Sequence, residues 1–246
     1  MLARHAVLFL ATLLLAAQLR PTAFATEPQR PERIDTLHLL PGFAAQRLYA
    51  VPREQQGSWV SLARGPNGSL FASDQGEAGI YKITPARLGD AADVTLVERI
   101  DVPVSGAQGL CYHRGVLYAN VNGKGPGVWA IRDTDGDGTF DATEHILPLK
   151  GAGEHGPHAV FPTPDGEHLI VMGGNYTQPA KLTASRLPSN WKEDLLLPRQ
   201  WDARGHAKGL LAPGGWIARM RPDGTEFEIL SVGYRNPYDA AFSPEG

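Results

Sequence analysis

The stretch that decides the fold runs from Arg114 to Arg132 and reads RGVLYANVNGKGPGVWAIR. The pair Arg114-Gly115 has the composition of a tight turn, and VLYANV after it alternates like a half-buried strand. A second glycine-rich turn follows, and Gly127 opens GVWAIR, which carries an aromatic residue near its start. Two such segments joined by turn residues predict a β-hairpin.

The same pattern occurs twice more in the chain. Residues 66–68 (PNG) lead into SLFASD and GIYKIT, and residues 164–166 (PDG) lead into EHLIVMG, with GWIARM following from Gly215. The three turn glycines, Gly68, Gly115 and Gly166, are about 50 residues apart, which is a repeat length typical of a β-propeller. The sequence therefore predicts an all-β protein, a β-propeller with one four-stranded sheet in each blade.

Two departures from this period are informative. Between Asn175 and Pro213 lies a long insertion without a strand or helix period, which predicts either a functional loop or a plain surface excursion. The final YDAAFSPEG repeats the approach to a turn glycine, as in HAVFPTPDG earlier. Residues 26–246 are thus expected to form about three and a half blades, truncated at the C-terminus, of a longer protein.

Composition excludes several classes of protein. The 246 residues have a net charge of -3 and no basic run, which argues against a nucleic-acid partner. Glycine (28) and proline (20) are abundant, which favours turns and short strands. The single cysteine, Cys111, lies in an apolar strand pattern, so a small buried residue is expected there rather than a nucleophile.

The first 25 residues have the pattern of a secretory signal peptide. Arg4 precedes an apolar run over residues 6–17, and residues 23–25 (AFA) form a small-x-small cleavage site. The run is too short to span a bilayer, which needs roughly 20 residues. A mature chain beginning at Thr26, without a transmembrane segment and located in the periplasm or outside the cell, is expected.

The sharpest local motif is DTDGDGTFDATE, from Asp133 to Glu144. Acidic residues fall at positions 1, 3, 5, 9 and 12 with glycine at position 6, which is the pattern of a 12-residue calcium loop. Apparent strands flank the motif, so a calcium ion would pin an inter-strand loop; a solvated Asp-Gly turn is the alternative. The predicted ligands are Asp133, Asp135, Asp137, the Thr139 carbonyl, Asp141 and Glu144.

A histidine cluster, GEHGPHAVFPTPDG, spans residues 153–166. His155 and His158 could bind a metal together with Glu154 or His206, could be purely structural, or could supply a base. The repeat places AVF on a blade strand and PTPDG in its turn. His155 then lies on the loop entering the innermost strand, where propeller sites gather, and His158 is expected to be a packing residue.

These segments resemble the soluble quinoprotein glucose/sorbosone dehydrogenase family. The family carries a histidine nine residues before the Pro-Asp of a blade turn, here His155, and an Arg-Asn-Pro before a strand, here Arg235-Asn236-Pro237. Its Gln-Gly-Leu stretch is similar to residues 108–110. The segments QGSWVSL, LPRQWDARGHA and LAPGGWIA look closer still to a subgroup of large exported bacterial proteins, described as membrane-bound dehydrogenases with a C-terminal c-type haem domain.

The resemblance implies a six-bladed propeller that binds pyrroloquinoline quinone (PQQ) and calcium and oxidises a sugar or related alcohol. By that resemblance His155 is the general base. Arg235 neutralises charge on the quinone oxygens, and Gln108, Arg235 and Asn236 bind the cofactor. Electrons would pass to a c-type haem domain outside this chain, since no Cys-x-x-Cys-His is encoded here.

This chain departs from the family pattern at two positions. The family's Gly-Arg after the histidine is His158-Ala159 here, and Tyr238 stands where the sugar dehydrogenases have glutamine. These departures leave a second hypothesis open, a non-catalytic, calcium-stabilised propeller that binds a glycan or a protein partner. A calcium-dependent lactonase is a third, and would need its metal on the central axis.

Overall fold

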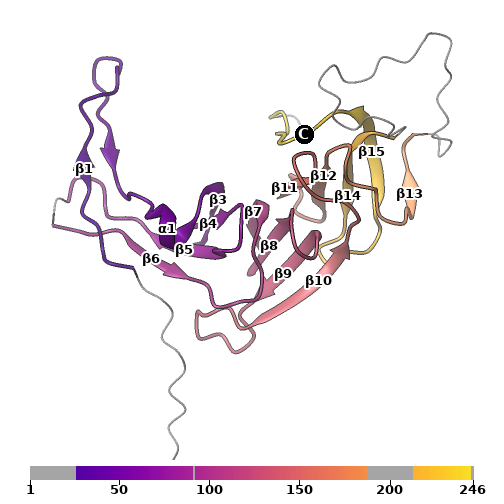
Figure 1. The fold of residues 1–246 in the computed structure, drawn as a ribbon, viewed down its shortest axis with the longest axis horizontal. Coiled ribbons are helices and arrows are strands. Elements are labelled where there is room, and N and C mark those ends of the chain that lie inside the picture. Colours follow the sequence, from indigo (N-terminus) through magenta and orange to yellow (C-terminus); the bar gives the residue numbers. More distant parts are fainter. Residues whose placement is uncertain (1–25, 91, 188–212, 245–246) are drawn as a thin grey trace, which may run out of the picture.

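The computed structural model describes residues 26–90, 92–187 and 213–244 of the chain. This part is built almost entirely of short antiparallel strands (Figure 1). Its single α-helix, α1, is one turn long (Arg53–Gln56), and a 3₁₀ turn, η1, covers Pro66–Gly68. The all-β class predicted from the sequence is confirmed.

The first two sheets have the same topology, in which four consecutive strands lie side by side in chain order. The first sheet contains β3 (Trp59–Arg64), β4 (Leu70–Asp74), β5 (Ile80–Thr84) and β6 (Leu96–Arg99). The second contains β7 (Ala107–His113), β8 (Val116–Val121), β9 (Gly127–Arg132) and β10 (Ala142–Pro148).

The third sheet repeats the same order with one addition. Its strands are β11 (Pro157–Pro162), β12 (Leu169–Gly173), β14 (Gly215–Met220) and β15 (Glu228–Tyr234), with the two-residue β13 (Ala184–Ser185) parallel to β15. A separate two-stranded ribbon, β1 (Glu32–Arg33) with β2 (Gln46–Arg47), precedes the first sheet.

The three sheets follow one another along an arc, as the blades of a propeller do (Figure 1). The first strand of each blade lies on the concave side, where β7 contacts both β3 and β11. The turns predicted from the repeat are those observed: Gly68, Gly115 and Gly166 all have φ between 70° and 84°. Arg114 also has a positive φ of 48°, which gives the β7–β8 hairpin the twist of a primed two-residue turn.

Alternation of side chains along the strands explains the packing between blades. In the second sheet, Leu117 pairs with Ile131 and belongs to a core shared with the first sheet, around Phe71. Their neighbours Tyr118 and Ala130 point the other way, into a core shared with the third sheet, around Trp216. Because successive residues of a strand face opposite sides, each blade is apolar on both faces.

Two expectations from the sequence, a buried Cys111 and a final half-blade, can be compared with this fold. Cys111 lies on β7 and is 6% exposed, and burial raises the pKa of its thiol to about 12, which confirms a buried residue rather than a nucleophile. Among the described residues after β15, none is in a strand, so the extra half-blade is not formed as a strand. A lone inner strand would have no neighbour with which to pair its backbone groups.

The predicted signal peptide lies outside the described residues, as do His206 and most of the insertion between Asn175 and Pro213. Within the part of the chain that is described, no helix has the length and apolar character needed to cross a membrane.

Candidate functional site

The histidine loop connects β10 to β11 and is held by the neighbouring hairpin. The Asn122 side chain, after β8, donates to the Gly153 carbonyl and accepts from the Gly153 amide, both at 2.8 Å. Gly156 packs so tightly here that a Cβ would lie 2.1 Å from Asn122 Oδ1. The glycines of the motif therefore let the loop fold back onto the second blade.

His155 lies in the loop directly before β11 and is completely buried, with 0% exposure. Its Nδ1 lies 2.6 Å from Asn175 Oδ1, and its ring packs against Tyr176 at a centroid distance of 4.7 Å. A carboxamide oxygen can only accept, so Nδ1 carries the hydrogen and Nε2 is the proton-accepting nitrogen of the neutral ring. Asn175 and Tyr176 follow β12 after one residue, Gly174, which brings them to the end of the sheet where the loop lies.

His158, the second residue of β11, is held in the same way by a different asparagine. Its Nε2 donates to Asn236 Oδ1 at 2.6 Å, while Asn236 Nδ2 donates to the Glu154 carbonyl at 3.2 Å. The His158 side chain is 2% exposed, and its Nδ1 has no hydrogen-bond partner among the described residues. Burial lowers the pKa of His158; the bond to Asn236 opposes this shift and the nearby His155 adds to it.

Tyr238 and Gln108 close this cluster on the side of the inner strands. The Tyr238 ring packs on His158 at a centroid distance of 4.5 Å, and its hydroxyl donates to Gln108 Oε1, on β7, at 3.1 Å. Strands β7 and β11 come close together at Gly109, where a Cβ would lie 2.4 Å from the His158 carbonyl oxygen. Only glycine permits this approach.

Arg235 joins the same region through its backbone. Its carbonyl accepts from the Asn175 amide at 3.0 Å, and its side chain is exposed. The structure thus brings together three segments that are distant in the sequence, those of Gln108, His155 and Arg235-Asn236.

The partners of the histidines were only partly predictable. The sequence marks Asn175 only as the start of an insertion, and nothing in its local pattern identifies it as a partner of His155. His158 is a packing residue, as expected, but it is also the partner of Asn236. Asn236, expected to bind a cofactor, uses its carboxamide to fix His158 and the loop.

A groove of about 400 Å³ lies beside this cluster, between the inner strands of the three blades and the segment after β15. It is lined by Val60, Ser61, Leu62, Gln108, Gly109, Leu110, Ala159, Val160, Phe161, Tyr238, Asp239 and Ala240. Gln108 and Tyr238 therefore face both the groove and the histidine cluster. The groove is the space in which a ligand of this site would lie.

The acidic loop between β9 and β10 forms a second, separate candidate site. Asp133, Asp135 and Asp137 each offer a carboxylate oxygen, and these oxygens lie within 4.8 Å of one another. Asp133 also accepts from the amides of Gly136 and Gly138 at 2.7 and 2.8 Å, which curls the loop around its carboxylate. These three of the predicted ligands are placed where a hard cation could bind them together.

The other predicted calcium ligands lie elsewhere in the loop. Asp141 accepts hydrogen bonds from the amide and hydroxyl of Thr134, at 2.8 to 3.0 Å. Glu144 is on β10 and pairs with Arg132 at 2.9 Å. Neither belongs to the group of three aspartates. The position-12 carboxylate is thus placed in a cross-strand ion pair, because β10 has already begun at Ala142.

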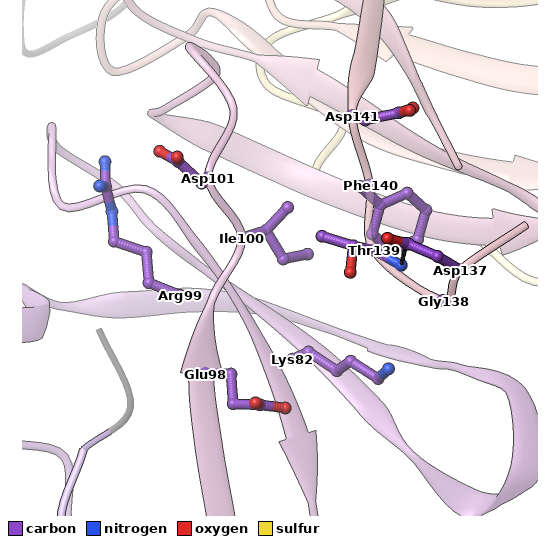
Figure 2. A pocket seen from close by; sticks show the side chains of 10 residues that line it. All are labelled: Lys82, Glu98, Arg99, Ile100, Asp101, Asp137, Gly138, Thr139, Phe140 and Asp141. Carbon is purple, nitrogen blue, oxygen red and sulfur yellow. Dashed lines mark hydrogen bonds between the residues drawn. The ribbon is translucent and has the colours of Figure 1, made fainter. Parts of the chain in front are cut away.

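The acidic loop also forms one wall of a cleft between the first two blades. Figure 2 shows Asp137 and Thr139 facing Lys82 and Glu98 across this space, which has a volume of about 570 Å³. Phe140 anchors the loop there by packing edge-on against Phe71 of the first blade, with ring centroids 5.7 Å apart. The loop precedes β10 and the histidine loop follows it, so the two sites lie at opposite ends of this strand.

Similar solved structures include two bacterial dehydrogenases, whereas no protein-family model and no curated protein matches this chain. One is the PQQ-bound aldose sugar dehydrogenase of Streptomyces coelicolor, with 20% identity, a TM-score of 0.45, and coverage of 73% of this chain and 51% of that one. The other is an oxidoreductase (glucose dehydrogenase) of Thermus thermophilus, with 21% identity, a TM-score of 0.44, and coverage of 75% and 54%. The chain spans about half the length of these two proteins.

Proposed function

We propose that this chain is a propeller module of a quinone-dependent dehydrogenase that oxidises a sugar or a related alcohol. The observation that carries the proposal is the convergence of Gln108, the His155 loop and Arg235-Asn236 beside one groove. These are the three motifs on which the family resemblance rests, and they come from three different parts of the chain.

In this proposal His155 accepts the proton of the substrate hydroxyl. Its Nδ1–H bond to Asn175 fixes the tautomer, so that Nε2 is the accepting nitrogen. An imidazole in this state suits general-base catalysis near neutral pH. Asn175 is then a positioning residue, which acts through the ring it orients.

The residues present fit the quinone in part. PQQ carries carboxylates and ring carbonyls, which require cationic and amide donors. The exposed guanidinium of Arg235 and the amide nitrogen of Gln108 offer such donors, whereas the Tyr238 hydroxyl already donates to Gln108 Oε1. Asn236 fits less well, because both its carboxamide atoms are already bonded to protein groups. Arg235 and Gln108 would therefore hold the cofactor, which when bound supplies the hydride acceptor.

The test is an assay of the full-length protein with PQQ and calcium, in which reduction of an artificial dye is followed with aldoses and alcohols. We expect substrate-dependent dye reduction, and a fall of about a hundredfold or more in His155→Gln, the range for loss of a general base. His168→Gln, at a partly exposed turn position, is the matched control and should stay active. Absence of dye reduction with every sugar and alcohol would overturn the proposal.

One observation favours the non-catalytic hypothesis as a second candidate. The His155 side chain is completely buried and packs under Tyr176, so a substrate can reach it only after a rearrangement. A propeller that only binds a glycan would use the groove and not the histidine. Binding to a glycan array that is unchanged by His155→Ala, together with no dye reduction, would establish this alternative.

We further propose that Asp133, Asp135 and Asp137 bind calcium and thereby fix the acidic loop. The role is structural, because the loop lies at the opposite end of β10 from the histidine loop. Localisation in the periplasm or outside the cell, and a c-type haem acceptor in the complete protein, remain parts of the proposal that rest on the sequence.

A further inference from the structure

The side chain of Asn236 bonds to the histidine loop on both sides of His155. Its Nδ2 donates to the Glu154 carbonyl at 3.2 Å, and its Oδ1 accepts from His158 Nε2 at 2.6 Å. The first partner precedes His155 in the chain and the second follows it. One carboxamide therefore spans the part of the loop that carries the proposed base.

These two contacts fix the orientation of the Asn236 carboxamide. A backbone carbonyl can only accept a hydrogen bond, so the group that faces Glu154 must be the amide NH₂. The carboxamide oxygen then faces His158, and the Nε2 atom of that ring must carry a hydrogen. The orientation of Asn236 is thus determined by protein groups alone.

The backbone of Arg235 holds the partner of the His155 ring. The Arg235 carbonyl accepts from the Asn175 amide at 3.0 Å, and the Asn175 side chain accepts from His155 Nδ1 at 2.6 Å. Together with the bond from Asn236 to the Glu154 carbonyl, these contacts form a closed ring of hydrogen bonds between three segments of the chain. Such a network can be worth more than the sum of its separate bonds.

Close packing joins the same three segments. The Gly174 amide donates to the Gly156 carbonyl at 2.9 Å, and the Tyr176 amide donates to the His155 carbonyl at 3.1 Å. A Cβ at Gly174 would lie 2.4 Å from the His155 carbonyl oxygen and 2.5 Å from Asn236 Oδ1. Because Asn236, the residues after β12 and the loop are in direct contact, a displacement of Asn236 should be transmitted to His155.

The groove beside the cluster does not explain the placement of Asn236. Gln108 and Tyr238 are among the residues that line the groove, whereas Asn236 is not. The bonds of Asn236 to Glu154 and His158 account for its orientation without a ligand.

We propose that Asn236 is a positioning residue for His155 and not a ligand of the cofactor. It closes the hydrogen-bond ring that directs the His155 side chain and keeps the hydrogen on Nδ1, so that Nε2 accepts the substrate proton. The inference rests on the proposed dehydrogenase function and replaces the cofactor-binding role that the family resemblance implies for Asn236.

The first test needs neither PQQ nor substrate. Exchange of the His155 Nδ1 hydrogen with water is followed by NMR in the full-length protein, labelled with nitrogen isotope in its histidines. We expect exchange to be about tenfold faster or more in Asn236→Ala, because opening the ring weakens the bond to Asn175, and each 1.4 kcal/mol is a factor of ten. Asn236→Asp keeps the acceptor for His158 but has no donor for the Glu154 carbonyl, so it should show the same change.

The second test is calorimetric titration of the same proteins with PQQ. We expect the PQQ affinity of Asn236→Ala to be unchanged. Gln108→Ala removes a side chain that lines the groove, so it should weaken PQQ binding about tenfold, the effect of one hydrogen bond to a charged group. In the dye assay at saturating PQQ, kcat of Asn236→Ala should fall by about tenfold to a hundredfold, since small displacements of a catalytic group have effects of this size.

Thr183→Val is the matched control. Thr183 Oγ1 donates to the Phe227 carbonyl at 3.0 Å, so this variant also loses a bond between distant segments, but at the outer edge of the third blade. Hydrogen exchange at His155, PQQ affinity and kcat should all stay unchanged in it.

Two results would contradict the positioning role. One is unchanged exchange of the His155 Nδ1 hydrogen in both Asn236 variants. The other is PQQ affinity about tenfold weaker in Asn236→Ala with kcat unchanged at saturating PQQ, which is the behaviour of a cofactor ligand. If the unmodified protein reduces no dye, the dehydrogenase proposal fails, whereas the exchange measurement still decides whether Asn236 holds His155.

Discussion

The histidine cluster and the acidic loop lie at the two ends of β10, about 20 Å apart for a strand of this length, and are built in opposite ways. The histidine cluster is buried and combines residues from four distant segments, with one asparagine holding each ring. The acidic loop is exposed, and its three clustered carboxylates come from one run of five residues, Asp133 to Asp137.

The difference shows what fixes each site. The acidic loop holds its carboxylates by local bonds to its own amides, so it depends little on the rest of the propeller. The histidines are fixed by Asn175 and Asn236, which reach them only after the third blade has formed. A fault in blade packing should therefore damage the histidine cluster and leave the acidic loop intact.

Gly174→Ala should have the largest effect and should fall on the histidine cluster alone. A Cβ at this position would lie 2.4 Å from the His155 carbonyl oxygen and 2.5 Å from Asn236 Oδ1. Overpacking against a backbone atom cannot be relieved by a rotamer change, so we expect a loss of about 3 kcal/mol in the free energy of unfolding. Urea denaturation measures it.

Gly123→Ala is the matched control for that experiment, because a Cβ there meets nothing within 4 Å. Its free energy of unfolding should stay close to that of the unmodified chain. Equal losses in the two variants would show that the close contact at Gly174 is not what holds the histidine cluster together.

Removal of calcium should have the next largest effect and should act only through the acidic loop. At a calcium concentration of about a hundred times Kd, binding to the folded state alone contributes about 2.7 kcal/mol. The double variant Asp133→Ala/Asp135→Ala should lose this calcium-dependent rise in melting temperature. The pair Asp165→Ala/Asp223→Ala, in two other exposed turns, should keep it. A calcium-induced shift that the first double variant retains would reject the site.

The fold was largely predictable from the sequence, because its signals are local. Turn glycines and alternating strands recur with the blade, and the observed hairpins β4–β5 and β8–β9 follow that repeat. The partner of β12 is β14, which the GWIARM pattern predicts in spite of the long insertion between them. The two-residue strands β1, β2 and β13 have too few residues to show a period.

The candidate site was predictable only in its contiguous parts. The motif around His155 and the pair Arg235-Asn236 could be found from the sequence, and so could the aspartates of the acidic loop. Asn175 and Asn122 could not be found from the sequence. Each bonds to a residue in a distant segment, and such a contact produces no recognisable spacing in the sequence. Glu144 is the opposite case: the sequence motif predicts it as a calcium ligand, but β10 begins before it. The strand places its carboxylate beside Arg132 and away from the three aspartates.

The pH dependence of stability should be smaller than these effects and should separate the two sites again. Burial lowers the pKa of His158 below its ordinary value of 6.5, so the unfolded chain binds more protons than the folded one between these two pKa values. Stability is then complete above pH 6.5 and falls as the pH decreases through that window. The groups facing the ring are His155 and Tyr238, together with the neutral Asn236.

His158→Gln should flatten this dependence, measured as the free energy of unfolding at pH values above and below 6.5. Burial also lowers the pKa of His145, so this histidine makes its own contribution to the pH dependence of stability. The variant His145→Gln is the control that measures that contribution. The stability of His158→Gln could instead fall as steeply at low pH as that of the unmodified chain. That result would show that the buried His158 does not cause the pH dependence.

Glu144→Gln should have the smallest effect, and it tests the boundary of the acidic loop. The carboxylate pairs with Arg132 at 2.9 Å but is mostly exposed, so its loss should cost less than about 1 kcal/mol in the free energy of unfolding. Because this side chain is engaged across the β9–β10 pair and lies outside the three aspartates, calcium should stabilise the variant as much as the unmodified chain. A loss of calcium response as large as that of Asp133→Ala/Asp135→Ala would instead mean that Glu144 leaves Arg132 to complete the twelve-residue loop, because a bidentate ligand at position 12 contributes strongly to such sites.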